Sequence, residues 1–452
     1  MNPQIFREYD IRGLVDQDLT DEVVEKLGLG LGTTLRRRGL RRLVLGRDCR
    51  ESSTRFRDVL SRGLCATGCD VLDIGVVPTP LTYFAANTLP VDGLAMITGS
   101  HNPPEYNGFK VGVGKTTFWG AEIQDLLKLI QSGRFEKGQG SVRPWDIVGP
   151  FNDFVRQDIR LGKRKLKLVI DAGNGVGGHV AVPLFQSMGF EVVPLFCEMD
   201  GRFPNHHPDP TIVKNMKALA ARVLEEKADL GIAYDGDADR IGVVDERGNI
   251  LWGDELTLLF ARELLQVEPG AAIVGEVKCS MRMYDQIAKA GGRPLMWKAG
   301  HSLIKAKMKE EGALLAGEMS GHIFWRHRYF GFDDAVYSTA RLLEILTRTD
   351  RKLSQMLEDV PKTFATEELR IDTVEEKKLE IVRRAVKRFK DAGLQVVDVD
   401  GARVVFPDGW GLVRSSNTQP ILVLRFEATS EKRLAEIRAM VEGALAEIQK
   451  AV

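Results

Sequence analysis

The sequence predicts an α/β protein that ends in a smaller α+β domain. Up to Pro361, short apolar runs alternate with longer amphipathic stretches, which is the pattern of α/β units. After Pro361 the pattern changes to a few strands and two long helices. The chain of 452 residues is also long enough for about three domains at ~150 residues each, so more than one core is expected.

The expected elements follow from these runs. The expected strands before Pro361 are Leu43–Gly46, Val71–Ile74, Leu94–Ile97, Leu166–Ile170, Glu191–Leu195, Leu230–Ala233, Ile241–Val244, Ile273–Val277 and Ala313–Ala316. The expected helices between them include Asp21–Leu35, Thr54–Thr67, Val213–Lys227, Asp254–Leu265 and Ser302–Glu311. The C-terminal part is expected to contain the helix Val374–Ala392, the strands Gln395–Val399, Ala402–Phe406 and Ile421–Phe426, and the helix Ser430–Lys450.

Turn signals near Gly149-Pro150, near Gly248-Asn249 and near Pro361 mark the expected joints. They divide the chain into 1–148, 149–248, 249–361 and 362–452. The first three blocks are similar in size and could be related in structure.

Composition and charge exclude several classes of protein. Lys plus Arg number 63, as do Asp plus Glu, so there is no basic excess for binding nucleic acid. No run of ~18 apolar residues predicts a membrane helix, and charges come too early for a signal peptide. The five scattered cysteines favour a reducing, cytoplasmic compartment. Cys65 and Cys69 are expected to be small buried hydrophobes rather than zinc ligands.

The segment Thr98–Lys110 follows an apolar run and is expected to be a loop at a strand end, where the ligands of α/β folds gather. We expect it to hold the Ser100 hydroxyl outward beside His101, with Lys110 in the same loop. A hydroxyl between a histidine and a lysine is a candidate nucleophile or phosphate carrier. The alternative is an ordinary turn.

Three aspartates, Asp235, Asp237 and Asp239, alternate in a short segment between two apolar runs. Carboxylates repel one another unless they surround a cation, and hard oxygen ligands suit Mg²⁺ or Ca²⁺. An EF-hand is excluded because Arg240 stands where that loop needs glycine and because the flanks are strands. A phosphoaspartate phosphatase would use Asp235 and Asp237 but would leave the Ser100 segment without a purpose.

Three further segments offer polar groups beside apolar runs. Gly173–Gly178 matches G-x-G-x-x-G between a strand and a helix, with Glu191 downstream, so it is either a dinucleotide site or a tight turn. Glu318 and Ser320 alternate and could both bond a polyol. Arg414–Pro420 combines an arginine with the short donors that a phosphate dianion requires.

Single residues elsewhere could add to a site. Arg12 and Tyr9 lie near the N-terminus, Lys278 follows an apolar run, and His301 precedes a helix. Solvated loop residues are the alternative interpretation of Lys278 and His301.

Together these segments resemble the α-D-phosphohexomutase family, in its bacterial phosphomannomutase/phosphoglucomutase branch, over the whole chain. The signatures stand in the family order, namely Phe6–Gly13, the Ser100 segment, Asp235–Arg240, Gly317–His322 and Arg414–Thr418. Five matches in order are specific where each alone is not. The resemblance implies three related α/β domains and a smaller C-terminal α+β domain around a central cleft.

The resemblance also implies roles for the residues. Ser100 would be the phosphoserine, and Mg²⁺ would be held by Asp235, Asp237, Asp239 and a phosphate oxygen on Ser100. The catalytic residues implied are Ser100, His101, Lys110, Arg12, Arg240 and His301. The substrate-binding residues implied are Tyr9, Lys278, Glu318, Ser320, His322, Arg414, Ser416, Asn417 and Thr418.

The implied activity is the reversible conversion of hexose 1-phosphate and hexose 6-phosphate, with mannose or glucose as the sugar. A 1,6-bisphosphate is the intermediate, and glucose 1,6-bisphosphate or mannose 1,6-bisphosphate is the activator. Small-molecule sugar phosphates are the expected partners, and the oligomeric state is left open. Met319 favours this branch over the phosphoglucosamine mutases. An NAD-dependent oxidoreductase built on Gly173–Gly178 and a silent sugar-phosphate binding protein are the remoter alternatives.

Overall fold

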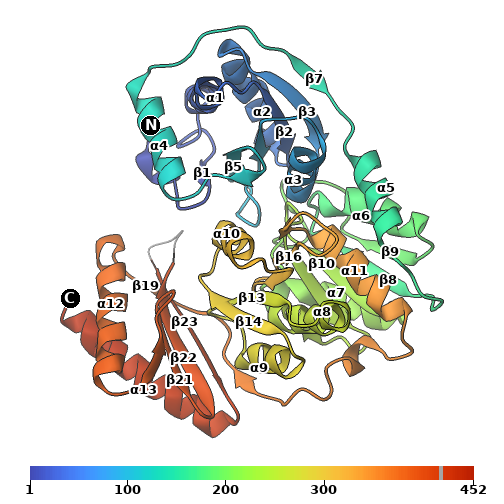
Figure 1. Cartoon of the computed structure of the whole chain (residues 1–452), viewed down its shortest axis with the longest axis vertical. Coiled ribbons are helices and arrows are strands. Elements are labelled where there is room, and N and C mark those ends of the chain that lie inside the picture. Colours follow the sequence, from blue (N-terminus) through green and yellow to red (C-terminus); the bar gives the residue numbers. More distant parts are fainter. Residues whose placement is uncertain (417–420) are drawn as a thin grey trace. The chain divides into compact units, whose positions relative to one another are not determined.

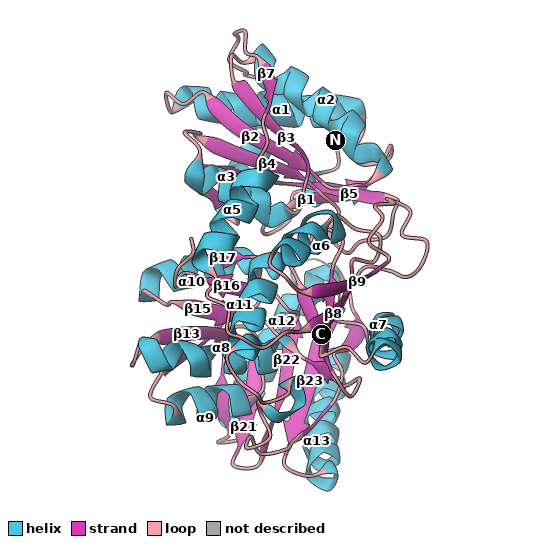
Figure 2. Ribbon diagram, turned by 90° about the vertical axis from the view of Figure 1, so that its right-hand side faces the viewer, coloured by secondary structure: helices cyan, strands magenta, loops and turns pink. Residues whose placement is uncertain are grey.

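The computed structural model describes residues 1–416 and 421–452, which form two compact units (Figure 1). The first unit comprises Met1–Leu256 and Ser320–Met356, and the second comprises Thr257–Met319 and Leu357–Val452. In each unit, helices flank the strands of the sheets (Figure 2).

The first unit contains mostly short buried strands and amphipathic helices in alternation. Its strands are β1 (Ile11–Leu14), β2 (Arg42–Arg47), β3 (Asp70–Val76), β4 (Gly93–Ile97), β5 (Tyr106–Val113), β6 (Thr116–Thr117), β7 (Val142–Pro144), β8 (Lys167–Asp171), β9 (Glu191–Leu195), β10 (Leu230–Tyr234), β11 (Ile241–Asp245), β12 (Ile250–Leu251), β16 (Ile323–Trp325) and β17 (Phe332–Asp333). Its helices are α1 (Asp21–Arg37), α2 (Glu51–Ala66), α3 (Thr79–Thr88), α4 (Ala121–Ser132), α5 (Val148–Asp158), α6 (Gly177–Ser187), α7 (Val213–Glu226) and α11 (Ala335–Thr347), with short 3₁₀ turns at Pro3–Ile5 and Leu353–Gln355.

The helix α8 (Gly253–Val267) leads from the first unit into the second. The strands of the second unit are β13 (Ala272–Glu276), β14 (Arg293–Trp297), β15 (Leu315–Gly317), β18 (Phe364–Ala365), β19 (Leu369–Asp372), β20 (Gln395–Val397), β21 (Ala402–Phe406), β22 (Gly409–Ser415) and β23 (Ile421–Ala428). Its helices are α9 (Met281–Lys289), α10 (His301–Glu311), α12 (Glu375–Asp391) and α13 (Glu431–Lys450).

Two mixed sheets organise the first unit. In the N-terminal sheet, of order β1-β5-β4-β2-β3-β7, the strands β4, β2, β3 and β7 are parallel, and β5 runs antiparallel between β4 and β1. In the next sheet, of order β12-β11-β10-β8-β9, the strands β10, β8 and β9 are parallel and β11 is antiparallel to β10. Loops at the carboxyl ends of β4 and β10 therefore carry the Ser100 and Asp235 segments.

The second unit contains a parallel part and an antiparallel part. β13 pairs in parallel with β14 and with β15. The C-terminal sheet, of order β18-β23-β22-β21-β20 with β19 beside β23, is antiparallel throughout. The helices α12 and α13 pack on it through a core that includes Ile381, Phe389 and Val441.

The predicted fold class is confirmed, since α/β sheets are followed by a smaller antiparallel α+β domain. Each strand expected before Pro361 overlaps an observed strand. The sequence interpretation assigned no strand to β1, β5, β6, β7, β12, β14, β16, β17 and β22. Within β5, the residues up to Lys110 were expected to belong to a loop. Two of the missed strands, β5 and β22, are paired on two edges, so pairing outweighs their weak local preference for strand.

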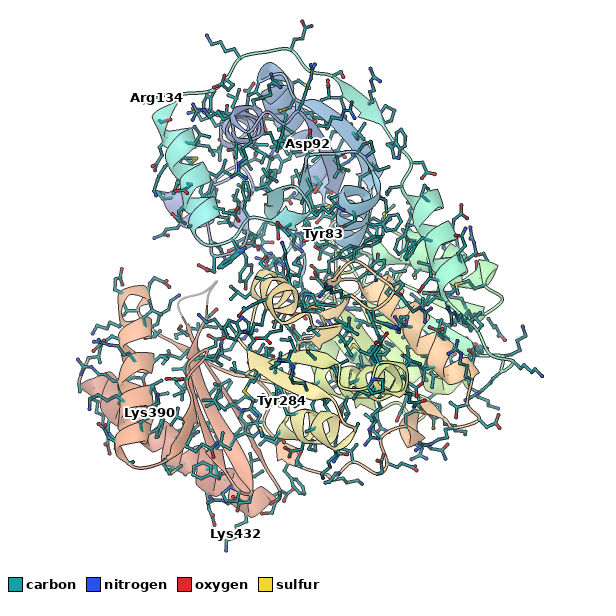
Figure 3. The ribbon with its side chains drawn as sticks, viewed as in Figure 1. Tyr83, Asp92, Arg134, Tyr284, Lys390 and Lys432 are labelled. Carbon is teal, nitrogen blue, oxygen red and sulfur yellow. The ribbon has the colours of Figure 1, made fainter. Side chains whose placement is uncertain are left out.

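The side chains separate into buried and surface groups in the expected way (Figure 3). Tyr83 and Tyr284 are buried, whereas Lys390 and Lys432 lie exposed on α12 and α13. Among the helices that the structure describes, none has the combination of length and apolar character that crossing a bilayer requires.

Candidate active site

The loop after β4, residues 98–105 (the Ser100 loop), carries the predicted nucleophile. β4 is buried along its whole length, and β5 returns antiparallel beside it, which leaves a tight connection. Ser100 has φ 49°, in the left-handed region that costs a non-glycine residue about 1–3 kcal/mol. Its amide donates to the Thr98 hydroxyl at 2.8 Å. The surrounding contacts must therefore hold the loop in this conformation.

The Ser100 hydroxyl does not point outward as the sequence predicted. The residue is 4% exposed, and Oγ donates to Asp235 Oδ2 at 2.9 Å, across 135 residues of sequence. Oγ also lies 3.1 Å from His101 Nδ1. Burial lowers the pKa of the His101 imidazole well below its usual range, and the charges of Arg240 and Arg12 act in the same direction. The lowered pKa disfavours the charged form of this imidazole beside the hydroxyl.

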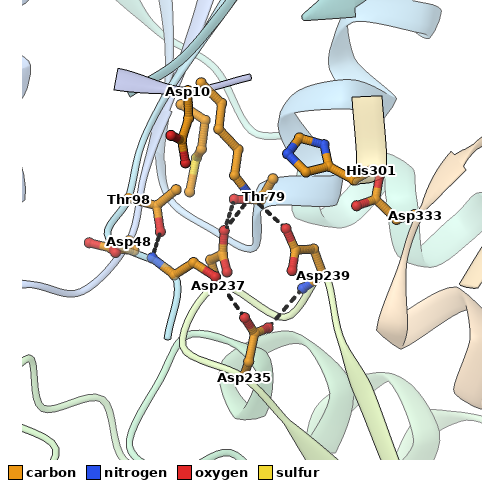
Figure 4. Close-up of polar contacts among 12 residues, drawn as sticks. Asp10, Asp48, Thr79, Thr98, Asp235, Asp237, Asp239, His301 and Asp333 are labelled. Carbon is orange, nitrogen blue, oxygen red and sulfur yellow. Dashed lines mark hydrogen bonds and ion pairs between the residues drawn. The ribbon is translucent and has the colours of Figure 1, made fainter. Parts of the chain in front are cut away.

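The loop between β10 and β11 (the aspartate loop, Asp235–Arg240) brings its three carboxylates together, as Figure 4 shows. One oxygen from each of Asp235, Asp237 and Asp239 lies within 4.8 Å of the others. All three residues are at most 1% exposed. Asp235 Oδ1 accepts from the amides of Asp239 (3.1 Å) and Arg240 (3.2 Å), which closes the loop on itself. The carboxylates thus face a common point inside the protein.

The electrostatics of the aspartate loop are those of an incompletely neutralised cluster. Burial and the charges of Asp237 and Asp239 raise the pKa of Asp235 well above its usual range. Burial also acts against the charge of Asp237, but Lys110 and the Thr79 hydroxyl outweigh it and lower the pKa of that carboxyl. Asp237 Oδ1 and Asp239 Oδ1 are buried and accept no hydrogen bond from the described part of the chain. Unsatisfied, buried carboxylate oxygens are the donor set that a hard divalent cation prefers, so these residues fit a metal site.

Lys110 supplies the ammonium that the cluster contacts. It lies on β5 rather than in the Ser100 loop, and Nζ donates to Asp237 Oδ2 at 2.9 Å and to Asp239 Oδ2 at 2.5 Å. Burial alone would lower the pKa of Lys110, but the two carboxylates raise it well above its usual range. Thr79 Oγ1 donates to Asp237 Oδ2 at 2.6 Å (Figure 4). One ammonium, that of Lys110, and two hydroxyls, those of Thr79 and Ser100, therefore contact the three acids.

Arg12 reaches the Ser100 loop from β1. Nη1 donates to Asn102 Oδ1 and Nη2 to Asp10 Oδ2, both at 2.6 Å. Since β1 pairs with β5, this guanidinium is placed by the same sheet that places Ser100 and Lys110. Tyr9, half-buried, precedes the strand by two residues.

His322 and Arg240 lie beside the aspartate loop. Arg240 Nε donates to His322 Nε2 at 3.0 Å, and their backbones form an isolated antiparallel bridge. His322 Nδ1 lies 3.0 Å from Asp333 Oδ2 and 3.6 Å from Asp239 Oδ1. The sequence singled out His322 and Arg240 but gave no signal for Asp333. Ser320, two residues before His322, is half-buried in the same unit.

In the second unit, Lys278 and Glu318 follow the strands β13 and β15. The ammonium of Lys278 lies 3.2 Å from Glu368 Oε2 and 4.0 Å from Glu276 Oε1. Glu368 and Glu276 raise the pKa of Lys278 although burial opposes them, and Lys278 in turn lowers the pKa of Glu368 to about 2. Glu318 Oε1 accepts from the amide of Gly300 at 2.7 Å, which ties it to the start of α10.

Three other predicted residues of the second unit, Arg414, Ser416 and His301, have defined neighbours. Arg414 lies on β22, and Nε donates to Asp400 Oδ2 at 3.0 Å, which also accepts from the amide of Ala299 at 3.0 Å. The carbonyl of Ser416 accepts from Lys378 Nζ at 2.8 Å. His301 opens α10, with Nδ1 3.4 Å from the Ser302 hydroxyl. Asn417 and Thr418 lie outside the described residues.

The segment Gly173–Gly178 forms a tight turn whose polar groups are taken by the chain itself. Asn174 has φ 63°, its amide group donates to the Glu198 carbonyl, and its Oδ1 accepts from Asn205 Nδ2 at 2.7 Å. α6 begins at Gly177. Of the two interpretations of the G-x-G-x-x-G pattern, the structure favours the turn.

Several well-placed residues were not identified from the sequence. Asp48 and Arg50 follow β2 and contact the Ser100 loop. Glu276 accepts from the amide of Lys278, and Asp400 accepts from the side chain of Arg414 on β22. Each of these follows or ends a strand, so the rule that found the Ser100 loop could have found Asp48 and Arg50.

Four family models match the chain in order. They describe the phosphoglucomutase/phosphomannomutase α/β/α domains I (residues 3–136), II (150–248) and III (252–364), and the C-terminal domain (368–444).

Full-length relatives and solved structures agree with these matches. Phosphomannomutase/phosphoglucomutase of Pseudomonas aeruginosa is 47% identical over 441 residues, 98% of this chain and 95% of that protein. Phosphoglucomutase of Neisseria gonorrhoeae is 45% identical over 438 residues, 96% of this chain and 95% of that protein. The crystal structure of a phosphoglucomutase/phosphomannomutase family protein from Burkholderia thailandensis superposes with a TM-score of 0.93 at 44% identity, covering 99% of this chain and 98% of that one. A more distant structure, an N-acetylphosphoglucosamine mutase of Aspergillus fumigatus in complex with GlcNAc-6P and magnesium, shares the fold at 16% identity, with a TM-score of 0.62 over 90% of this chain and 77% of that one.

Proposed function

The chain belongs to the phosphoglucomutase/phosphomannomutase family and interconverts hexose 1-phosphates and hexose 6-phosphates, and we propose that it does so through a phosphoserine at Ser100. The observation that carries the proposal is the contact of the Ser100 hydroxyl with Asp235 at 2.9 Å, inside a buried cluster of three aspartates. A nucleophile beside a metal-type acidic cluster is suited to phosphoryl transfer, which depends on positioning and charge neutralisation.

We propose Mg²⁺ as the metal, held by Asp235, Asp237, Asp239 and a phosphate oxygen on Ser100. The buried oxygens without hydrogen-bond partners support a hard cation. When bound, Mg²⁺ would neutralise the charge of the transferring phosphoryl group. Lys110 and Arg12, held near Ser100 by β5 and β1, add fixed positive charge, and Arg240 does so from the aspartate loop.

In the proposed cycle, phosphoserine gives its phosphoryl group to the free hydroxyl of a sugar phosphate. The bond from phosphorus to Ser100 Oγ breaks, a bond to the sugar oxygen forms, and the sugar hydroxyl gives up its proton. The resulting 1,6-bisphosphate reorients in the site so that its other phosphate faces Ser100. The bond between that phosphorus and the sugar oxygen then breaks, and a bond from the phosphorus to Ser100 Oγ forms. In that return step the Ser100 hydroxyl loses its proton, and the acceptors within hydrogen-bond distance are His101 Nδ1 and Asp235 Oδ2.

The second unit is proposed to supply most of the contacts to the sugar phosphate. Carboxylate and hydroxyl groups of Glu318 and Ser320 would bond sugar hydroxyls, with Lys278, His301, His322 and Tyr9 as further ligands. Arg414, Ser416, Asn417 and Thr418 would hold the phosphate that is not transferred. Glucose 1,6-bisphosphate or mannose 1,6-bisphosphate would prime the enzyme by phosphorylating Ser100.

Phosphorus NMR tests this proposal directly. Purified protein with Mg²⁺ and a trace of glucose 1,6-bisphosphate is given glucose 1-phosphate, with mannose 1-phosphate and glucosamine 1-phosphate in parallel tubes. We expect the 1-phosphate signal to convert to the 6-phosphate signal for glucose and mannose, and the two rates to rank these sugars. Conversion of the glucosamine compound alone would overturn the assigned sugar class, and no conversion of any would overturn the mutase.

A further inference from the structure

One arginine outside the predicted site, Arg50, organises the backbone of the Ser100 loop. It stands between β2 and α2, and its side chain is fully buried. Buried arginines are rare unless paired, because burial of a charge is costly. Burial accordingly lowers the pKa of Arg50, while Asp48 favours its charge.

All five N–H donors of the Arg50 guanidinium have acceptors. Nε donates to Asp48 Oδ2 at 3.2 Å. The other four donate to main-chain carbonyls in and just after the Ser100 loop, those of Ser100 (2.8 Å), Asn102 (2.6 Å), Pro103 (2.6 Å) and Tyr106 (2.9 Å). A planar, rigid fork of donors thus fixes the positions of four carbonyls at once.

Asp48 joins Arg50 in holding the loop, and we call the two residues the clamp: Arg50 donates to carbonyls of the loop, and Asp48 accepts from one of its amides. Its Oδ2 accepts from the amide of Gly99 at 3.1 Å, and its Oδ1 accepts from the amide of Arg50 (3.0 Å) and from Ser53 Oγ (2.5 Å). A Cβ at Gly99 would lie 2.5 Å from Arg50 Cζ, so the guanidinium and the residue before the nucleophile are in direct contact.

A second segment covers the guanidinium from outside. The ring of Phe203 lies over it, with 5.0 Å from Cζ to the ring centroid. A Cβ at Gly201 would come within 2.6 Å of Arg50 Cα. A Cβ at Gly236 would lie 2.4 Å from the Ser100 carbonyl oxygen, so the aspartate loop packs on the same oxygen to which Arg50 donates. The main chain at Ser100 is therefore in close contact with both Arg50 and the aspartate loop.

We propose that Arg50 is a positioning residue for phosphoryl transfer: it acts through the backbone of the Ser100 loop to fix the serine hydroxyl against Asp235. The inference rests on the proposed role of Ser100. Arg50 touches neither the hydroxyl nor the carboxylates of the aspartate loop in any contact described above. Its effect is to keep Ser100 in its left-handed conformation, and a displacement of about 1 Å at a reacting atom can reduce the rate about a hundredfold.

The test compares Arg50→Lys with Arg62→Lys, a control on the exposed face of α2, the helix that follows Arg50, where the side chain pairs with Glu25. Lysine keeps the charge but offers three donors from one atom, so it cannot bond all five acceptors of Arg50. Hydrogen exchange of the amides of residues 99–102 and 105–106, on either side of Pro103 and Pro104, is measured in the unphosphorylated protein. The constants kcat and KM are measured for the mutase reaction. A thermal melt shows whether Arg50→Lys is folded at the assay temperature, and Arg50→Gln replaces it if not.

We expect exchange in the Ser100 loop to quicken roughly tenfold in Arg50→Lys, kcat to fall roughly a hundredfold, and KM to stay within about threefold of wild type. Arg62→Lys should change none of these. Unchanged exchange in the loop would overturn the clamp, and faster exchange with an unchanged kcat would overturn the positioning role. A wild-type protein without mutase activity or phosphoserine would instead overturn the proposed function, while the exchange measurement would still report on the clamp.

Discussion

Two strand-end loops of this chain are held by the same device, a buried arginine that donates to main-chain carbonyls. In the first unit, Arg50 binds the Ser100 loop after β4. In the second, the loop after β13, residues 277–280 (the Lys278 loop), is bound by Arg403 through the carbonyls of Val277 and Cys279, and by Arg425 through that of Lys278.

The two loops differ in which sheet supplies their arginine, and in how many of the guanidinium N–H donors have hydrogen-bond acceptors. Arg50 follows β2, in the same sheet as β4, and all its donors have acceptors. Arg403 lies on β21 of the C-terminal sheet, over 120 residues after the loop it holds; Nε and Nη2 lack hydrogen-bond partners among the described residues. It stacks instead on the ring of Trp410, 3.7 Å from Cζ to the centroid.

This difference indicates that the chain positions its nucleophile and its Lys278 loop through separate sets of contacts. The nucleophile is fixed from within its own sheet, independently of the C-terminal sheet. The Lys278 loop is fixed by the C-terminal sheet itself, so any displacement of that sheet changes the loop. Damage to the first loop should therefore appear in kcat, and damage to the second in KM.

Ser100→Ala should reduce turnover more than any other change considered for the two loops. Without the hydroxyl no phosphoserine forms, so we expect turnover to fall by at least about a thousandfold. Sugar-phosphate binding, measured by calorimetry, should remain within about threefold, because Ser100 is not proposed to bind the substrate. The surface variant Ser132→Ala serves as the control, and more than a few per cent of wild-type turnover in Ser100→Ala would contradict the assignment.

Asp237→Asn should weaken metal binding and leave the structure of the second unit unchanged. Asp237 carries one of the two buried carboxylate oxygens of the aspartate loop that have no hydrogen-bond partner among the described residues, and an amide is a poorer ligand for a hard cation than a carboxylate. We expect affinity for Mn²⁺, used as a spectroscopic substitute and followed by EPR of the free ion, to weaken by at least about tenfold.

The matched control for this change is Asp229→Asn, an aspartate just before β10 that pairs with Arg164 rather than with the cluster. Equal Mn²⁺ affinity in both variants would show that the aspartate loop is not the metal site.

Arg403→Met tests the Lys278 loop. Methionine can fill part of the space over Trp410 but leaves the carbonyls of Val277 and Cys279 without their donor, which costs about 1–3 kcal/mol of stability. We expect KM for the sugar phosphate to rise roughly tenfold, because a displaced loop weakens ligand binding, while kcat stays within about threefold. The control is Arg438→Met on the exposed face of α13. A fall in kcat without a change in KM would reverse the proposed division of tasks.

The sequence predicted the strands that form continuous apolar runs, and it predicted the acidic cluster, because both leave a local pattern. Continuous apolar runs such as Leu94–Ile97 identify buried parallel strands, here β4. Alternating Asp235, Asp237 and Asp239 predicted the metal-type cluster that the structure shows.

The missed features depend on contacts between segments distant in sequence. Asp235 turns the Ser100 hydroxyl inward from 135 residues away, which no local pattern records. Arg50 and Arg403 act on main-chain carbonyls, and carbonyls are the same in every residue, so the sequence carries no sign of their acceptors. The glycine-rich pattern at Gly173–Gly178 was ambiguous for the converse reason: a tight turn and a dinucleotide loop use the same residues.

The smallest expected effect concerns the segment that covers Arg50. His206, three residues after Phe203, has Nε2 3.0 Å from Asp171 Oδ2. Burial acts to lower the pKa of the imidazole, but the hydrogen bond and charge of Asp171 outweigh it and raise the pKa above its usual value. A raised folded-state pKa contributes stability that is fully present below the unfolded value of about 6.5 and is lost as pH rises through the folded value.

His206→Gln should therefore lower the thermal midpoint at pH 6 by roughly 2 °C relative to wild type, and the difference should shrink at pH 9. The matched control is His179→Gln, which removes an exposed histidine of α6. A difference between wild type and His206→Gln that stays constant from pH 6 to pH 9 would show that the Asp171 contact does not depend on the charge of the imidazole. We also expect His206→Gln to leave kcat unchanged, because the five donors of Arg50, rather than the segment that carries His206, hold the Ser100 loop.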